Sequence, residues 1–314
     1  MIKQEVKFKP DLAIQVKELR KSYGNDEVVS GIDLEVQTGE IFALLGPNGA
    51  GKTTTVEILE GYRNRNSGEI DVLGHDPSLN ETAFKQKIGI VLQKTGVEPY
   101  LTVEETIYLF SRYYHCPRDA EEIIEVTGLT DVRKIRVKKL SGGQQRRLDV
   151  AIGLAGNPEL LFLDEPTTGF DPMARRNAWD MIKNLQEIGK TVFLTTHYMD
   201  EAEYLADRIA LIVQGKIIAE GSPKQLIGLN SATLIEFRID KLTTGFPKAI
   251  QAITKTHNGL ITIQTDKPEN VLFELTRWAI NKNIILNELS VSKPSLEDTY
   301  LKLVNQGHLK HDNE

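Results

Sequence analysis

The chain has 314 residues, of which 26% are charged and 40% hydrophobic, and its formal net charge at pH 7 is −6. This length exceeds the usual domain size of about 100–200 residues, so we expect one medium domain and a smaller one. The negative balance argues against a general nucleic-acid binder, whose footprint is basic. The single cysteine, Cys116, excludes an intrachain disulfide framework and Cys₄ metal sites and fits a reducing cytosol.

The first 11 residues lack the apolar core of a secretion signal, so we expect a short arm that leads into the first strand. No apolar run approaches the roughly 20 residues needed to span a bilayer. Runs such as Leu160 to Leu163 and Ile209 to Val213 have the length of strands.

The first part of the chain has β character and leads into a glycine-rich loop. Residues 12–45 show apolar alternation with a period of two. GPNGAGKTT follows the apolar run Ile41 to Leu45 and matches GxxxxGK[ST]. Between a strand and a helix, such a loop points backbone N–H groups at phosphates, while Lys52 reaches the outer phosphates and Thr53 ligates Mg²⁺. An ordinary glycine-rich turn is the alternative. We predict a phosphate site made of Gly46, Pro47, Asn48, Gly49, Ala50, Gly51, Lys52, Thr53 and Thr54.

Helical patterns follow from about residue 102 to residue 139. Thr102 is a predicted N-cap, and Glu105 completes a capping box. Ile107, Phe110, Tyr113 and Tyr114 lie near one face, which we expect to pack in a core, with a partner-facing surface as the alternative. The basic run over residues 133–139 is expected to be a solvated loop or a phosphate-steering edge rather than a nucleic-acid site.

The sequence LSGGQ follows this region, from Leu140 to Gln144. Ser141 is a suitable N-cap, and the N–H groups of Gly142 and Gly143 then form an anion-binding helix N-terminus. A plain helix cap is the alternative. The pattern therefore predicts a second phosphate-binding surface in the same chain.

Two carboxylates end the next apolar run, LLFLDEP, at residues 160–166. Ligands of phosphate-binding α/β sheets lie beyond the carboxyl ends of the strands. We therefore assign Asp164 to Mg²⁺ and Glu165 to the attacking water, although a solvated strand end would read the same in isolation. Because side chains alternate along a strand, the two neighbouring acids need not do the same work.

The last third of the chain carries no nucleotide motif. RIALIVQGKIIAEG reads as a hairpin that turns at Gln214 and Gly215. Beyond residue 228 the segments TLIEFRI, LITIQT and IILNELSV predict strands, and VLFELTRWAINKN predicts a helix. We expect a small α/β domain without chemistry of its own, with a core drawn from Leu234, Phe237, Phe273, Trp278 and Leu286.

The three motifs, together with Gln93 after the predicted strand Ile88 to Leu92 and His197 after Thr191 to Thr196, resemble the ATP-binding subunits of ABC transporters. The resemblance covers roughly residues 12–225. It implies an α/β fold: a P-loop NTPase core (ABC ATPase) with a helical subdomain, here joined to the small C-terminal domain. The expected divisions are an N-terminal arm over 1–11, an ABC ATP-binding domain over 12–228 with its helical subdomain at about 94–156, a C-terminal accessory α/β domain over 229–306, and a polar tail over 307–314.

The resemblance also implies roles for single residues. Tyr23 corresponds to the aromatic that stacks on adenine, although packing is a common role for such a residue. Gln93 corresponds to the glutamine that contacts Mg²⁺ and the attacking water, and His197 to the histidine that contacts the γ-phosphate. Asp171 corresponds to the acidic residue that communicates between two ATP sites. The signature residues Ser141, Gly142, Gly143 and Gln144 would close over ATP held by another subunit, which implies a head-to-tail dimer, expected to be a homodimer.

The segments LTVEETIYLF and SVSKPSLEDTYLKL resemble drug-exporter and ABC-2-type ATP-binding subunits more closely. This resemblance implies ATP and Mg²⁺ as cofactors, an integral-membrane permease on a separate chain, and a cytoplasmic, peripheral position on the inner face of the cell membrane. No nucleic-acid partner is expected. A soluble ABC ATPase that acts on a macromolecular complex, and a binding module that senses ATP without hydrolysing it, are the alternatives. The presence of both Glu165 and His197 argues against a module that senses ATP without hydrolysing it.

Overall fold

A computed structural model of the chain describes residues 11–91, 96–229, 232–239, 246–247, 250, 254–257 and 259–311. The chain divides into two compact units, Met1–Pro223 (unit 1) and Lys224–Glu314 (unit 2). Unit 1 holds every motif singled out in the sequence. None of the helices in the described residues is long and apolar enough to cross a membrane.

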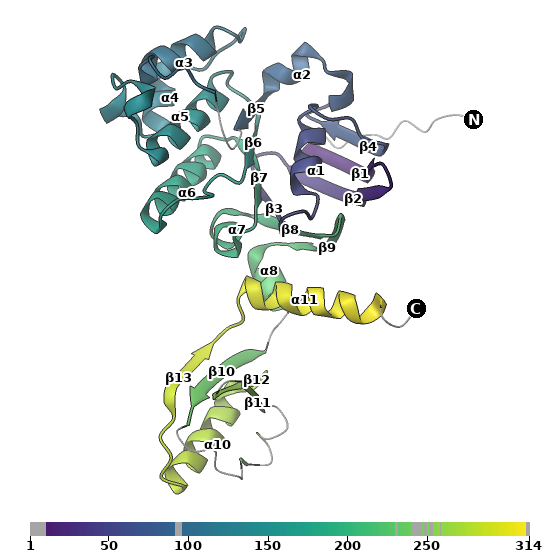
Figure 1. The fold of residues 1–314 in the computed structure, drawn as a ribbon, viewed down its shortest axis with the longest axis vertical. Coiled ribbons are helices and arrows are strands. Elements are labelled where there is room, and N and C mark those ends of the chain that lie inside the picture. The colour runs from purple at the N-terminus through teal and green to yellow at the C-terminus, as the bar shows by residue number, and fades with distance from the viewer. Residues whose placement is uncertain are drawn as a thin grey trace, which may run out of the picture. The chain divides into compact units, whose positions relative to one another are not determined.

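Unit 1 contains two sheets and a set of helices (Figure 1). The strands and helices of the two sheets and their connections are β1 (Leu12–Tyr23), β2 (Asp26–Gln37), β3 (Ile41–Leu45), α1 (Lys52–Leu59), β4 (Ser67–Val72), α2 (Thr82–Lys87), β5 (Ile88–Val91), β6 (Leu160–Asp164), α6 (Pro172–Glu187), β7 (Thr191–Thr196), α7 (Met199–Leu205), β8 (Arg208–Val213) and β9 (Lys216–Gly221). Between β5 and β6 lie α3 (Val103–Ser111), α4 (Ala120–Val126) and α5 (Gly142–Leu154). Short 3-10 turns cover Pro77–Leu79, Thr130–Val132 and Val137–Lys139.

The larger sheet of unit 1 has the strand order β5-β6-β7-β3-β8-β9. Strands β5, β6, β7, β3 and β8 are parallel, and β9 pairs antiparallel with β8. Apolar residues fill these central strands, as expected for a sheet covered on both faces. Because parallel strands end at one edge, the segments that follow β3, β6 and β7 meet there.

The smaller sheet of unit 1 is antiparallel, in the order β2-β1-β4. It shares a hydrophobic core with α1 and the larger sheet. Phe193 lies at the centre of this core, with ring centroids 5.6 Å from Phe42 and 5.8 Å from Phe162. Aromatic ring pairs at these separations stabilise the fold beyond the burial of their apolar surface. They help to hold β3, β6 and β7 together.

Helices α3, α4 and α5 lie together on the side of unit 1 away from β1, β2 and β4 (Figure 1). The predicted capping box is present: Thr102 accepts from the Glu105 N–H, and the Glu105 carboxylate accepts from the Thr102 N–H. Ile107 is fully buried, but Tyr113 is 71% exposed. The expectation that the aromatic residues of this region pack in a core is therefore wrong for Tyr113, because α3 ends at Ser111 and releases the following side chains from its inner face.

The basic run over residues 133–139 contains a structural residue. The guanidinium of Arg133 bonds to Glu104 of α3 at 2.9 Å and to both carboxylate oxygens of Glu121 of α4 at 2.7 and 2.8 Å. Arg133 therefore joins α3 to α4, and its positive charge is paired with carboxylates of the same unit.

Unit 2 contains a four-stranded antiparallel sheet, and α10 (Pro268–Asn281) packs on it. The elements are α8 (Pro223–Gly228), which begins at the unit boundary, then β10 (Thr233–Arg238), β11 (Thr254–His257), β12 (Leu260–Thr265), α10 (Pro268–Asn281), β13 (Asn287–Ser292) and α11 (Leu296–His311), and the sheet order is β11-β12-β10-β13. Helix α11 takes in residues 307–311 of the expected polar tail.

The core of unit 2 differs in part from the predicted one. Phe237 and Trp278 belong to it, and Leu286 packs against it. Phe273 is 60% exposed, so its prediction as a core residue is wrong. Helix α10 turns Leu275, Trp278 and Ala279 toward the sheet, which leaves Phe273 on the solvent side. Leu234 is only half-buried, because alternate residues of β10 face opposite sides of the sheet.

Candidate active site

The phosphate loop connects β3 to α1, as predicted. At Gly46 an added Cβ would lie 2.3 Å from the Ile212 carbonyl oxygen, and Gly51 has φ +103° and no room for a side chain beside the Val28 carbonyl. Only glycine fits these two positions. The hairpin turn between β8 and β9 supports the loop, since the Gly215 N–H donates to the Ala50 carbonyl at 3.0 Å. That turn has positive φ at both Gln214 and Gly215, as the hairpin prediction requires.

Lys52, the first residue of α1, reaches back over the loop. Its Nζ donates to the carbonyl oxygens of Gly46 at 2.8 Å and Pro47 at 3.1 Å. Its side chain is only 5% exposed. Burial lowers the pKa of Lys52, and the nearby carboxylates Glu165 and Asp164 act in the opposite direction. The ammonium group thus lies at the loop with little water around it, where its attraction for an anion is strong.

A cavity of about 390 Å³ opens over the start of α1. The first N–H groups of a helix have no partner within the helix, and no side chain caps this helix at Gly51. The exposed Thr53 lies in the cavity wall with Lys52 and Glu165; Asn48, Gly49, Gly51, Thr54 and Val28 complete the lining. Unpaired N–H groups, an ammonium group and a hydroxyl make this cavity an anion site.

Glu165 follows β6 and has a left-handed backbone, with φ +45°. Its N–H donates to the carbonyl and to the hydroxyl of Thr195 on β7, both at 3.1 Å. Its carboxylate Oε1 lies 3.7 Å from Lys52 Nζ and 3.2 Å from His197 Nδ1, and Oε2 accepts from the Thr168 hydroxyl at 3.1 Å. The turn after β6, the end of β7 and the start of α1 thus bring an acid, an imidazole and an ammonium group together.

Asp164 is the last residue of β6 and faces a different environment from Glu165. Its carboxylate accepts from the Thr195 hydroxyl. Its backbone carbonyl accepts from Arg146 at 3.2 Å, and the Pro166 carbonyl accepts from the same guanidinium at 3.0 Å. The two neighbouring acids therefore differ in contacts, in line with their separate predicted roles.

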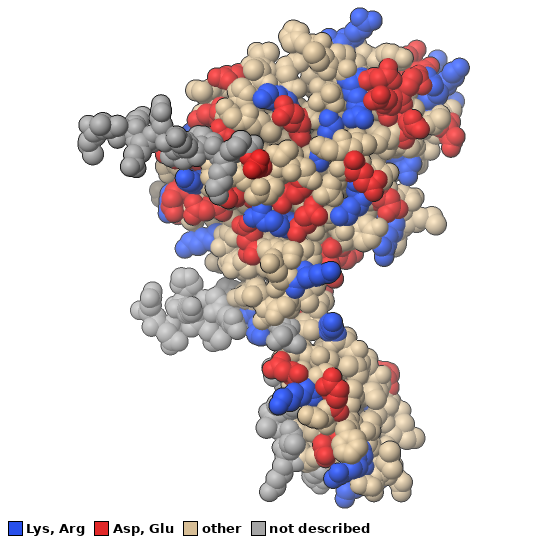
Figure 2. Space-filling view, turned by 180° about the vertical axis from the view of Figure 1, so that it is seen from behind, with Lys and Arg blue, Asp and Glu red and all other residues tan. Residues whose placement is uncertain are grey.

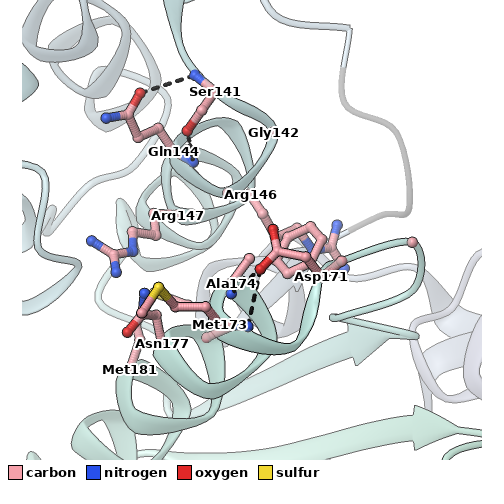
Figure 3. Close-up of a pocket in the computed structure, with 14 residues that line it drawn as sticks. Ser141, Gly142, Gln144, Arg146, Arg147, Asp171, Met173, Ala174, Asn177 and Met181 are labelled. Atoms are coloured by element: carbon pink, nitrogen blue, oxygen red, sulfur yellow. Dashed lines mark hydrogen bonds between the residues drawn. The ribbon is translucent and has the colours of Figure 1, made fainter.

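The signature residues form a second cavity, of about 470 Å³, at the start of α5 (Figure 3). Ser141 is the N-cap: its hydroxyl accepts from the Gln144 N–H at 3.3 Å, and the Gln144 side chain accepts from the Ser141 N–H at 2.9 Å. Gly142 and Gly143 are the first two helical residues and line the cavity with Ser141 and Gln144. This cavity and the phosphate-loop cavity have no lining residue in common.

Asp171 lines the same second cavity and caps α6 (Figure 3). Its carboxylate accepts from the N–H groups of Met173 at 3.0 Å and Ala174 at 2.9 Å. Pro172 occupies the first helical position. The capping role of Asp171 was missed in the sequence, although Asp followed by Pro is a local signal for a helix start.

Tyr23, the predicted adenine-stacking residue, lines neither of these cavities. Tyr23 ends β1 and is 41% exposed, so it is not a core residue. The cationic groups of Lys21 and Arg63 each lie 5.3 Å from its ring centroid. Gln93 lies outside the described residues.

Several site residues carried no recognisable signal in the sequence. Arg146 sits in a polar run after LSGGQ and resembles an exposed helical residue, yet it is 7% exposed and braces the end of β6. Thr195 contacts both Asp164 and Glu165 from the neighbouring strand. Only the pairing of β6 with β7 brings these residues together, because they are 30 positions apart in the chain.

Comparison with known proteins agrees with this geometry. The family model described as "ABC transporter" matches residues 29–168. The linearmycin resistance ATP-binding protein LnrL of Bacillus subtilis (strain 168) is 36% identical over 303 residues, which cover 92% of this chain and 97% of that protein. The Nod factor export ATP-binding protein I of Rhizobium meliloti (strain 1021) is 37% identical and covers 94% of this chain and 89% of its own length. A dimeric ATP-binding cassette in a post-hydrolysis state, bound to ADP and Pi, superposes with a TM-score of 0.59 at 27% identity and covers 67% of this chain and 98% of that one. The chain belongs to the ABC transporter family, as an ATP-binding subunit.

Proposed function

We propose that the chain hydrolyses ATP at the site around Glu165 and uses the resulting dimer closure and reopening to drive a membrane exporter of the drug or antibiotic-resistance type. One observation carries the proposal. The Glu165 carboxylate lies within 3.7 Å of Lys52 Nζ and 3.2 Å of His197 Nδ1 at the rim of the anion cavity. A base and a cation at one phosphate site can position water and stabilise the charge that develops during phosphoryl transfer, and the imidazole contacts the base.

Binding begins with the phosphates. The N–H groups at the start of α1 donate hydrogen bonds to the phosphate oxygens, and Lys52 exchanges its loop carbonyl contacts for the outer phosphates. Tyr23 offers an exposed ring for stacking on adenine, where base stacking is worth about 1–3 kcal/mol.

Hydrolysis then depends on Glu165. Its carboxylate accepts a proton from the attacking water as the water approaches the γ-phosphorus, and Lys52 stabilises the negative charge that develops on the phosphate oxygens. His197 holds Glu165 in place and reaches the same phosphate. The backbone of Glu165 has a left-handed conformation and is held by Thr195, which orients the carboxylate toward Lys52 and His197.

The residues of the site suit Mg²⁺. Thr53 and Asp164 offer a hydroxyl and a carboxylate oxygen, the ligand type that Mg²⁺ prefers. Among the described residues, no group of three or more His, Cys, Asp or Glu side chains is arranged so that it could hold a metal ion. This fits a metal held by few protein ligands together with nucleotide phosphates. When bound, Mg²⁺ would neutralise negative charge on the nucleotide phosphates; Gln93 is the third proposed ligand.

The separation of the two cavities supports a dimer. The signature cavity with Ser141 and Gly143 shares no residue with the phosphate-loop cavity, so we propose that each signature closes over ATP held by a second copy of the chain. The similar cassette bound to ADP and Pi is itself dimeric. We propose that Asp171, which lines the signature cavity, communicates between the two ATP sites.

The relatives support an exporter as the partner. One of them is named for resistance to linearmycin and another for Nod factor export. We propose that an integral-membrane permease on a separate chain holds this subunit at the inner face of the cell membrane. The exposed Tyr108 and Tyr113, on the helical side of unit 1, are candidates for that contact.

Neither the distribution of surface charge nor the net charge suggests a nucleic-acid partner. On the face shown in Figure 2, Lys and Arg are interspersed with Asp and Glu rather than gathered in one basic area. Arg133 of the basic run is paired with Glu104 and Glu121. The net charge of −6 points the same way.

Replacement of Glu165 by Gln tests the proposed function. The amide keeps the size of the side chain but cannot take the proton, so turnover is expected to fall by at least about 100-fold while ATP binding persists. The variant should accumulate as an ATP-bound dimer on size-exclusion chromatography with Mg-ATP. Unchanged turnover would remove Glu165 from the role of base, and a monomer at saturating ATP would count against the sandwich dimer.

A further inference from the structure

A buried acid lies behind the proposed catalytic groups and has no part in the mechanism above. Glu201 of α7 is fully buried, with 0% exposure. Burial of a carboxylate is unfavourable unless hydrogen bonds compensate. We propose that Glu201 is a positioning residue, which holds the turn that carries Glu165 against the segment that carries His197.

The first contact reaches the turn after β6. The Thr167 hydroxyl donates to Glu201 Oε1 at 2.7 Å, and both side chains are fully buried. Thr167 lies two residues after Glu165, in a turn where the Thr168 N–H bonds back to the Glu165 carbonyl and the Phe170 N–H to the Thr167 carbonyl. A fixed Thr167 therefore restricts the backbone of Glu165, which already has an unfavourable φ.

The second contact reaches α6. The indole N–H of Trp179 donates to the same Oε1 at 3.1 Å. Trp179 is 4% exposed and lies two turns into the helix that Asp171 caps. One carboxylate oxygen thus joins the catalytic turn to the helix whose first residues line the signature cavity.

The third relation is to the histidine side. Helix α7 begins two residues after His197, and Glu201 lies in it. Burial raises the pKa of Glu201, while the hydrogen bonds from Thr167 and Trp179 act against this shift. Glu201 therefore lies in the helix that follows His197 and bonds to the turn that follows Glu165, so it links the two segments whose side chains meet in the Glu165–His197 contact.

A charged cluster closes the outer side of α7. Arg175 bonds to Asp200 at 3.2 Å, and its guanidinium carbon lies 4.3 Å from the centroid of the Tyr198 ring. These contacts hold α6 against α7 without touching the turn after β6. They therefore account for the packing of α6 against α7. The bond from Thr167 to Glu201 is separate, because it acts on the turn that carries Glu165.

The inference rests on the proposed function, since it assigns Glu201 a role in hydrolysis through Glu165. The test measures steady-state turnover, KM for ATP and thermal stability of the full-length chain with Mg-ATP. Thr167→Val removes the hydroxyl but keeps the shape, so we expect turnover to fall about tenfold with KM within about twofold, because a displaced catalytic group loses rate rather than binding. Glu201→Ala should lose about 10- to 100-fold in turnover.

Two comparisons separate positioning from stability. Glu201→Gln keeps an acceptor oxygen and should restore turnover to within about threefold of the wild type. Leu205→Ala removes a fully buried side chain from the same helix without loss of a hydrogen bond, so it should lower the melting temperature and leave turnover of the folded protein unchanged. Should Glu201→Ala fail to fold, Thr167→Val and Glu201→Gln carry the test.

The outcomes distinguish the two proposals. Normal turnover of Thr167→Val beside an inactive Glu165→Gln would overturn the role of Glu201 alone, as would an equal loss in Glu201→Gln and Glu201→Ala. A parallel rise in KM would also overturn it, because Glu201 would then act on binding. An active Glu165→Gln variant would instead overturn the proposed function.

Discussion

The larger sheet of unit 1 and the sheet of unit 2 differ in strand direction, and this difference explains why the candidate site lies on the first. In unit 1, β6, β7 and β3 are neighbours and parallel, so Glu165, His197 and the phosphate loop emerge at one edge. In unit 2, β10 pairs antiparallel with both of its neighbours, so consecutive strand ends point to opposite edges. Functional groups converge beyond the carboxyl ends of parallel strands; an antiparallel sheet has no such edge.

Polar groups are also used differently in the two units. In unit 1, Lys52, Arg146 and Glu201 are buried and bonded around the site. In unit 2 the Arg238–Glu288 pair is exposed at 2.9 Å, where ion pairs contribute little to stability. We therefore expect the stability of unit 2 to come mainly from its apolar core.

The largest expected effect tests that separation from the side of unit 2. Phe237→Ala should reduce the free energy of unfolding of unit 2 by about 3–5 kcal/mol, because it leaves a cavity in a small core. ATP affinity should not change. Thermal unfolding and calorimetric ATP titration measure the two effects, and Phe273→Ala, at an exposed position, is the matched control. A loss of ATP affinity in the folded Phe237→Ala variant would break the comparison.

The next effect concerns the cation of unit 1. Lys52→Ala removes the ammonium group that contacts the loop carbonyls and faces the anion cavity. Charge-assisted hydrogen bonds are worth about 1.5–3 kcal/mol, so ATP affinity should fall about 10- to 100-fold in equilibrium titration. The exposed Lys134 provides the control, since its replacement by Ala should leave affinity unchanged. Equal affinities of the two variants would contradict the assignment of Lys52.

A smaller effect is expected at Tyr23, whose exposed ring is the proposed adenine platform. Tyr23→Ala should lose about 1–3 kcal/mol of ATP binding. At a ligand concentration 100 times the dissociation constant, wild-type stabilisation by ATP is about 2.7 kcal/mol, so the loss is visible as a reduced thermal shift. Pyrophosphate, which lacks the base, should shift both proteins equally. If the ATP-dependent shifts are also equal, Tyr23 does not contact adenine.

The last effect is a pH dependence at Glu60, the C-cap residue of α1. Burial, with the nearby charges of Asp164 and Glu57, raises the pKa of Glu60 from 4.5 to about 8. The folded state therefore binds this proton more tightly than the unfolded state, so stability present below pH 4.5 is lost as pH rises toward about 8. Glu60→Gln should flatten this decline in urea unfolding without nucleotide or Mg²⁺. Glu69→Gln, at an exposed position, is the control; an unchanged slope in Glu60→Gln would show that Glu60 titrates normally.

Features that depend on a few consecutive residues were predicted from the sequence. The phosphate loop, the Thr102–Glu105 capping box and the turn at Gln214 and Gly215 all occur where the sequence placed them. Their hydrogen bonds close within a few residues, so spacing alone specifies them. The apolar strands before the loop and before Asp164 were also evident, because a buried parallel strand needs a continuous apolar run.

Other features required the tertiary structure. The Glu201 side chain belongs to an acidic helix in the sequence, and only the packing of α7 against α6 and the turn after β6 buries it. The exposed positions of Phe273 and Tyr113 depend on which face of a helix meets a sheet and on where that helix ends. The direction of Glu165 depends on Thr195, which reaches it from a neighbouring strand. The sequence by itself thus indicated the phosphate loop, Glu165 and His197, but not the residues that support them. Long-range pairing decided how they face one another, because those contacts join residues about 30 positions apart whose separation no local pattern encodes.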